Sequence, residues 1–215
     1  MTPEERFARF EEMKAHYKML DDDGLRRGEL PMGETTHGFW GTTNMNDAWL
    51  LFRRIGLERF TRFVDLGTGD GRIVAIASLF THAVGIEGDE DLVRKGKDAW
   101  EHLGLRDAEL KLQDFYDEPL GAYDIAFMFP DKAFDARLVG KLLEEFHGHL
   151  LLYNDIYLPV MLPKGRKIWI EQLPVTPFHI NVPRENLERG EVSPRGERGV
   201  DGNILLGQPN HNLFK

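Results

Sequence analysis

The feature that most constrains this chain is a short apolar run that leads into three closely spaced glycines and then into a helical pattern. The run reads Phe63-Val64-Asp65-Leu66-Gly67-Thr68-Gly69-Asp70-Gly71-Arg72-Ile73-Val74. Its apolar opening is typical of a buried parallel strand. A strand that turns through glycines into a helix presents backbone N–H groups and the positive end of a helix dipole to a ligand. The sequence therefore predicts a strand, a ligand-binding turn and a helix in this order.

The spacing of the glycines and the nearby charges indicate which ligand the turn suits. The dinucleotide fingerprint needs its third glycine after a two-residue gap, and Arg72 stands in that later position. Asp65 and Asp70 flank the turn, and carboxylates are poor neighbours for a pyrophosphate. They suit a ligand that carries an ammonium group, such as the amino acid end of S-adenosylmethionine (SAM).

The segment Asp65-Leu66-Gly67-Thr68-Gly69-Asp70-Gly71 resembles the first motif of the class I SAM-dependent methyltransferases. The longer run to Val74, together with Val84-Gly85-Ile86-Glu87, is most similar to the seven-strand protein-lysine methyltransferases. The resemblance implies an α/β fold with a Rossmann-like sheet that is mostly parallel and has an antiparallel closing strand. It also implies that SAM is the cofactor.

Further acids follow two later predicted strands. Glu87 ends the strand over 83–87, and an acid about 20 positions beyond the first strand can accept both ribose hydroxyl hydrogens. Asp114 and Phe115 end the strand over 109–115, where the resemblance implies contacts to the adenine amino group and ring. The expected cofactor contacts are Thr43, Asp65, Gly67, Thr68, Gly69, Asp70, Gly71, Glu87, Gly88, Asp114 and Phe115.

The fourth predicted strand, over 123–131, runs into the loop Phe129-Pro130-Asp131. Ligands bind beyond the carboxyl ends of parallel strands, so this loop is expected to face the transferable methyl group. We expect Phe129, Pro130 and Asp131 to be the catalytic residues, with Asp131 orienting or deprotonating the acceptor. Asp131 would alternatively cap the helix that follows.

The loop also bears on the acceptor. It departs from the Asn/Asp-Pro-Pro-aromatic motif of enzymes that methylate adenine or cytosine amino groups. Phe-Pro-Asp resembles the transfer-RNA guanine-N7 methyltransferases too, but their following Pro-Trp and basic cluster are absent. We expect methyl transfer to a protein side chain, lysine being one option, or to a small molecule. The alternatives are a guanine-N7-type RNA methyltransferase and a SAM-binding scaffold protein without catalysis.

The segments outside the glycine turn suggest three regions. Residues 1–45 are expected to hold a helix with a Thr2–Glu5 capping box, ended by Asp21-Asp22-Asp23-Gly24, and then an irregular loop. In that loop Phe39-Trp40 is either a lid over a flat ligand or a plug at the domain edge. Residues 46–173 are the expected SAM-binding domain, with a first helix capped by Asn46 or Asp47. Residues 174–215, rich in proline and glycine, are expected to form an irregular arm packed on the domain or on a partner.

Bulk properties exclude several classes of function. A formal net charge of −9 disfavours broad binding to nucleic acid, so a nucleic-acid partner is not expected. There is no cysteine, which excludes disulfides and thiolate chemistry. We expect no metal, and interpret His147-Gly148-His149 as a cap and loop. No apolar run has the length of a membrane span, so a cytoplasmic protein without membrane contact is expected. A homodimer is a further expectation.

Overall fold

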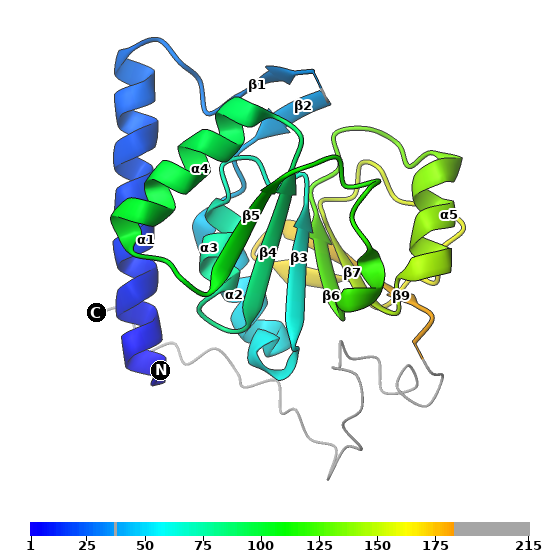
Figure 1. Cartoon of the computed structure of the whole chain (residues 1–215). Coiled ribbons are helices and arrows are strands. Elements are labelled where there is room, and N and C mark those ends of the chain that lie inside the picture. The colour runs from blue at the N-terminus through cyan, green and yellow to red at the C-terminus, as the bar shows by residue number, and fades with distance from the viewer. Residues whose placement is uncertain (37, 183–215) are drawn as a thin grey trace.

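The computed structural model describes residues 1–36 and 38–182, and its centre is a seven-stranded sheet between helices (Figure 1). The strand order is β5-β4-β3-β6-β7-β9-β8. The strands are β3 (Arg62–Leu66), β4 (His82–Glu87), β5 (Ala108–Leu112), β6 (Ile125–Met128), β7 (Gly148–Tyr153), β8 (Ile168–Ile170) and β9 (Leu173–Ile180).

The directions of the strands confirm the predicted fold class. Strands β3 to β7 pair in parallel, while β9 is antiparallel to both β7 and β8. The order reverses at β3, because β4 lies on one side of it and β6 on the other. Such a switch point leaves a crevice at the carboxyl ends of the strands, where ligands bind in open α/β sheets.

Helices cover both faces of the sheet, because side chains along each strand alternate between the faces. Phe63 packs on the face covered by α1 to α4, and Val64 on the face covered by α5. The helices are α1 (Pro3–Arg26), α2 (Met45–Ile55), α3 (Arg72–Ala77), α4 (Glu90–Leu103) and α5 (Ala136–Glu145), with short 3-10 turns η1 (Leu57–Arg59) and η2 (Leu120–Ala122). Within the described residues, no helix is both long and apolar enough to cross a bilayer.

The N-terminal region is more ordered than expected. The Thr2–Glu5 capping box is confirmed, but α1 continues through the three aspartates to Arg26. The expected irregular loop contains a hairpin of β1 (Met32–Thr35) and β2 (Gly38–Gly41). Figure 1 shows this hairpin above the carboxyl ends of the sheet strands. The predicted cap of α2 was also wrong, because Asn44 accepts the hydrogen bond from the N–H of Asn46.

The expected C-terminal arm begins inside the sheet. Its residues 174–180 belong to β9, and Pro177 is tolerated because β8 pairs with β9 only as far as Val175. His149 is a buried residue of β7 instead of a loop residue, and its Nδ1 lies 2.7 Å from Nδ1 of His179. The rest of the arm, 183–215, and its expected packing lie outside the described residues.

Candidate cofactor and methyl-transfer site

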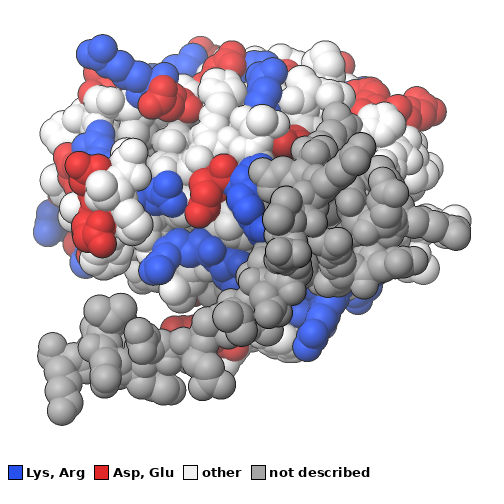
Figure 2. All heavy atoms as spheres, turned by 90° about the horizontal axis from the view of Figure 1, so that it is seen from below, with Lys and Arg blue, Asp and Glu red and all other residues white. Residues whose placement is uncertain are grey.

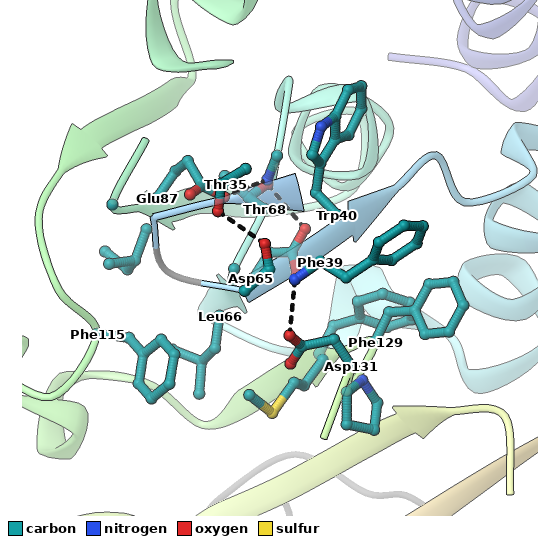
Figure 3. Close-up of a pocket in the computed structure, with 18 of the residues that line it drawn as sticks. Thr35, Phe39, Trp40, Asp65, Leu66, Thr68, Glu87, Phe115, Phe129 and Asp131 are labelled. Carbon is teal, nitrogen blue, oxygen red and sulfur yellow. Dashed lines mark hydrogen bonds between the residues drawn. The ribbon is translucent and has the colours of Figure 1, made fainter. Parts of the chain in front are cut away.

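A pocket of about 270 Å³ lies at the carboxyl ends of β3, β4, β5 and β6 (Figure 3). It brings together residues from the glycine turn, the three following strand ends and the N-terminal hairpin. The predicted site residues that line it are Thr43, Asp65, Gly67, Thr68, Gly69, Asp70, Glu87, Gly88, Asp114, Phe115, Phe129, Pro130 and Asp131. Gly71 is the one predicted residue that does not line the pocket.

The three glycines of the turn all have positive φ values, of 79° for Gly67, 60° for Gly69 and 74° for Gly71. Other residues adopt this conformation only at a cost of about 1–2 kcal/mol. A Cβ on Gly67 would meet no atom within 4 Å, so its backbone borders open space. A Cβ on Gly71 would lie 2.8 Å from Trp100 Cζ2. Gly67 therefore leaves room for a ligand, while Gly71 allows α4 to pack against the turn.

Glu87 ties the glycine turn to the start of α4. Its Oε2 accepts a hydrogen bond from the N–H of Gly69 at 2.8 Å, and its Oε1 accepts one from the N–H of Asp89 at 2.9 Å. The side chain is buried, so these two bonds compensate for the lost hydration of the carboxylate. Asp114 is oriented in a similar way, because its Oδ1 accepts from the N–H of Tyr116 at 2.9 Å.

Asp65 is the most deeply buried acid of the pocket, with 3% of its surface exposed. Burial raises the pKa of this carboxyl to about 7. A hydrogen bond of 2.8 Å from the Thr68 hydroxyl opposes the rise in pKa, and the negative charges of Glu87 and Asp70 add to it. A cationic ligand next to Asp65 would favour its ionised form.

The carboxylate of Asp70 already has a cationic partner within the protein. Arg72 Nε donates to both oxygens of Asp70, at 3.0 and 3.1 Å, and Arg72 Nη2 donates at 2.6 Å. Asp21 of α1 binds the other edge of the same guanidinium. The prediction that the helix ends at Asp21 was therefore wrong, and it missed this contact between distant segments.

The loop over 129–131, which was expected to face the methyl group, contacts the N-terminal hairpin. Asp131 Oδ2 accepts from the backbone N–H of Phe39 at 2.9 Å (Figure 3). A Cβ on Gly38 would lie 2.2 Å from the same oxygen, so glycine permits this close contact. Asp131 is not the cap of α5, because Asp135 accepts from the N–H of Leu138 there.

Aromatic rings form much of the pocket wall. Phe39 and Trp40 both line it, which favours the first of the two alternatives, a lid, over a plug at the domain edge. The Trp40 ring lies close to the glycine turn, because a Cβ added to Gly69 would be 3.7 Å from Trp40 Cε3. Phe129 is 41% exposed and packs against Tyr153, with ring centroids 5.1 Å apart.

Sequence reasoning missed the part of the rim formed by Tyr116 and Asp135. The Tyr116 hydroxyl donates to Asp135 at 2.9 Å, and the Arg137 guanidinium lies 3.9 Å from the ring centroid. Burial, followed by this hydrogen bond, raises the pKa of Tyr116 to about 12. A tyrosine after Phe115 was visible in the sequence, but its partner is distant in the chain. In residues 1–36 and 38–182, no three His, Asp or Glu side chains form a group that could hold a metal.

The sequence matches no protein-family model and no sequence among curated proteins. Solved structures with the same fold include an RNA methyltransferase from Salinibacter ruber in complex with S-adenosyl-L-homocysteine. That structure is 22% identical, covers 65% of this chain and 93% of its own, and has a TM-score of 0.58.

Two further structures have the fold at lower identity. A SAM-dependent methyltransferase from Aquifex aeolicus is 16% identical, covers 62% of this chain and 88% of its own, and has a TM-score of 0.52. Mitomycin 7-O-methyltransferase is 14% identical, covers 62% of this chain and 52% of its own, and has a TM-score of 0.51. The chain therefore has the fold of the class I SAM-dependent methyltransferases.

Proposed function

We propose that the protein is a SAM-dependent methyltransferase whose acceptor is an amine, either on a protein side chain such as lysine or on a small molecule. The observation that carries this proposal is one pocket with Asp65, Glu87 and Asp114 on neighbouring strand ends and the loop 129–131 on its far wall. The fold is one that such enzymes use, and the pocket lies at its switch point.

The pocket residues fit a cofactor with an ammonium group, a ribose and an adenine. Asp65 offers a buried carboxyl to the ammonium group. Each Glu87 oxygen accepts one backbone N–H and keeps a second lone pair for a ribose hydroxyl. Phe115 offers an aromatic face to the base, and Gly67 leaves the space that close approach of a ligand to the backbone requires.

When bound, SAM supplies a methyl group on a positively charged sulfur that a nucleophile can attack in line. The protein then has to align the acceptor and remove the proton that an amine carries. Asp131 lies on the loop expected to face the acceptor, and its contact with Phe39 fixes its position. Phe39 and Phe129 form apolar walls that keep water away from the acceptor.

The charges of the pocket support a cationic acceptor. Six acidic side chains line it, from Asp65, Asp70, Glu87, Asp114, Asp131 and Asp135. The lysines and arginines among its described lining residues are Arg72, which two carboxylates bind, and Lys132. Such a site attracts an ammonium group and disfavours a polyanion, and the aromatic walls add cation–π attraction. On the opposite side of the molecule, basic and acidic side chains are mixed over the visible surface (Figure 2).

The first test is isothermal titration of the protein with adenosylhomocysteine. Glu87→Ala should weaken binding roughly tenfold or more, because a charged hydrogen-bonding group is lost. Glu90→Ala is the matched control, since it removes an exposed carboxylate three residues away and outside the pocket. Absence of binding to the wild-type protein would refute the proposal.

The second test identifies the acceptor. Labelled SAM is incubated with the protein and cell extract, which is then separated into protein, RNA and small-molecule fractions. Label in methylated amines of protein or small molecules is expected. Label confined to RNA would favour the guanine-N7 alternative, and binding without any transfer would favour a scaffold protein.

A further inference from the structure

An ion network joins the N-terminal helix to the glycine turn, and it is buried except at Asp21, whose side chain is 29% exposed. The Arg72 guanidinium lies between two carboxylates, and its Nη1 and Nη2 donate to Asp21 at 3.0 and 2.8 Å. On the other edge, Nε and Nη2 donate to Asp70. Asp21 is on α1 and Asp70 is in the turn, so one arginine side chain connects segments that are 49 positions apart (70 − 21).

Two aromatic residues complete the network. The Arg72 guanidinium lies 5.0 Å from the ring centroid of Tyr17, which is also on α1. The Tyr17 hydroxyl donates to the backbone carbonyl of Asp70 at 3.1 Å and accepts from Trp100 Nε1 at 3.1 Å. The turn residue Asp70 is therefore held by its side chain and by its backbone.

The central charges of the network are largely shielded from water. The Arg72 side chain is 7% exposed, and that of Asp70 is 14% exposed. Burial acts to lower the pKa of Arg72, but the hydrogen bond to Asp21 and the charge of Asp70 outweigh it and raise this pKa well above its ordinary value. Loss of one partner leaves a buried charge with incomplete pairing, which is costly in a way that an exposed ion pair is not.

We propose that Asp21 and Tyr17 of α1 are positioning residues for cofactor binding, which act through Arg72 and Asp70 on the glycine turn. The inference rests on the proposed function, because it concerns the same pocket. It also changes the role of Asp70: its carboxylate positions the turn instead of binding the cofactor. The cofactor site then depends on α1, which is neither part of the sheet nor one of the helices that connect its parallel strands.

The physical reason lies in the backbone of the turn. Gly67, Gly69 and Gly71 all adopt left-handed conformations, and glycine has the greatest freedom to leave them. The N–H of Gly69 must point at Glu87 for the carboxylate to be oriented toward the pocket. Fixing Asp70 between two of these glycines reduces the conformations open to the turn before a ligand arrives, and this preorganisation favours binding.

The test is the affinity for adenosylhomocysteine of Asp21→Asn, measured by isothermal titration at a temperature where every variant is fully folded. We expect roughly tenfold weaker binding, the effect of losing a charged hydrogen bond that orients the site. Asp21→Glu keeps the charge and should restore part of the affinity. Asp22→Asn is the matched control, because Asp22 pairs only with the exposed Lys18 among described residues.

A second control separates positioning from general stability. Phe10→Leu weakens the packing of α1, where Phe10 stacks on Trp49 at 4.5 Å, without touching the ion network. It should lower the melting temperature and leave the affinity unchanged. Equal affinity of Asp21→Asn and wild type would overturn the inference, and so would an equal loss in Phe10→Leu. If the wild-type protein itself does not bind, the proposed function fails instead.

Discussion

Replacement of Asp65 by asparagine should stabilise the ligand-free protein while weakening its binding of the cofactor. Burial raises the pKa of Asp65 from 3.8 to about 7. Between these values the folded protein holds a proton that the unfolded chain releases, so stability falls as the pH rises. Each pH unit between the two pKa values lowers the free energy of unfolding by about 1.4 kcal/mol. The total loss is about 4 kcal/mol, and it is complete just above pH 7.

Asparagine does not titrate in this range, and its amide oxygen can still accept from the Thr68 hydroxyl. Asp65→Asn should therefore equal the wild type in stability near pH 3 and exceed it increasingly up to pH 8. Urea unfolding at a series of pH values measures the difference in the free energy of unfolding. A difference that stays constant across this range would refute the buried, protonated carboxyl.

The same carboxyl predicts that cofactor binding is linked to proton release. At pH 7 about half of the ligand-free molecules carry a neutral Asp65, as a pKa of about 7 requires. An ammonium group next to it lowers the pKa, so binding should release about half a proton. Titration of adenosylhomocysteine in buffers with different ionisation enthalpies measures this number. Heats that do not depend on the buffer would show that Asp65 does not meet the ligand's charge.

Three other substitutions test separate parts of the pocket. Glu87→Gln leaves one backbone N–H without its acceptor, so unfolding should become easier by about 1–3 kcal/mol in thermal melts, together with weaker adenosylhomocysteine binding. Gly67→Ala and Gly104→Ala should each lower the free energy of unfolding in urea by about 1–2 kcal/mol, because both glycines have positive φ and an added Cβ would meet no atom within 4 Å. Only Gly67→Ala should also weaken adenosylhomocysteine binding, because Gly67 lines the pocket. Asp131→Asn keeps an acceptor for the Phe39 N–H but loses the negative charge. The rate of methyl transfer should fall while the affinity for the cofactor stays unchanged. An equal loss of rate and of affinity would contradict the assignment of Asp131 to the acceptor side.

Local patterns predicted much of the sheet, and all but one of the predicted site residues line the pocket. The glycine turn, Glu87 and Asp114 each follow a strand, and the carboxyl ends of parallel strands meet at one edge, so these residues converge once the strands pair in parallel. The helix start at Thr2, with its capping box to Glu5, also depends on neighbouring residues alone.

Predictions failed where a residue's partner is distant in the chain. An acidic run ordinarily ends a helix in water, but Asp21 stays helical and meets Arg72. Pro174 and Pro177, at the start of a segment rich in proline and glycine, suggested an irregular arm, yet residues 174–180 belong to β9, which pairs with β7. His149 was predicted to lie in a loop, but it belongs to β7 and faces His179 of β9.

The glycine turn and the strand-end acids of the pocket follow from short-range patterns, because strand, turn and acid lie within a few positions of one another. Packing of distant segments determines how those residues are held: Arg72, which binds Asp70, also binds Asp21 of α1, and Asp131 binds the N-terminal hairpin. Such pairs depend on how the chain returns to itself in three dimensions. A carboxylate in the sequence carries no sign of whether its partner will be water, a ligand or an arginine from another helix.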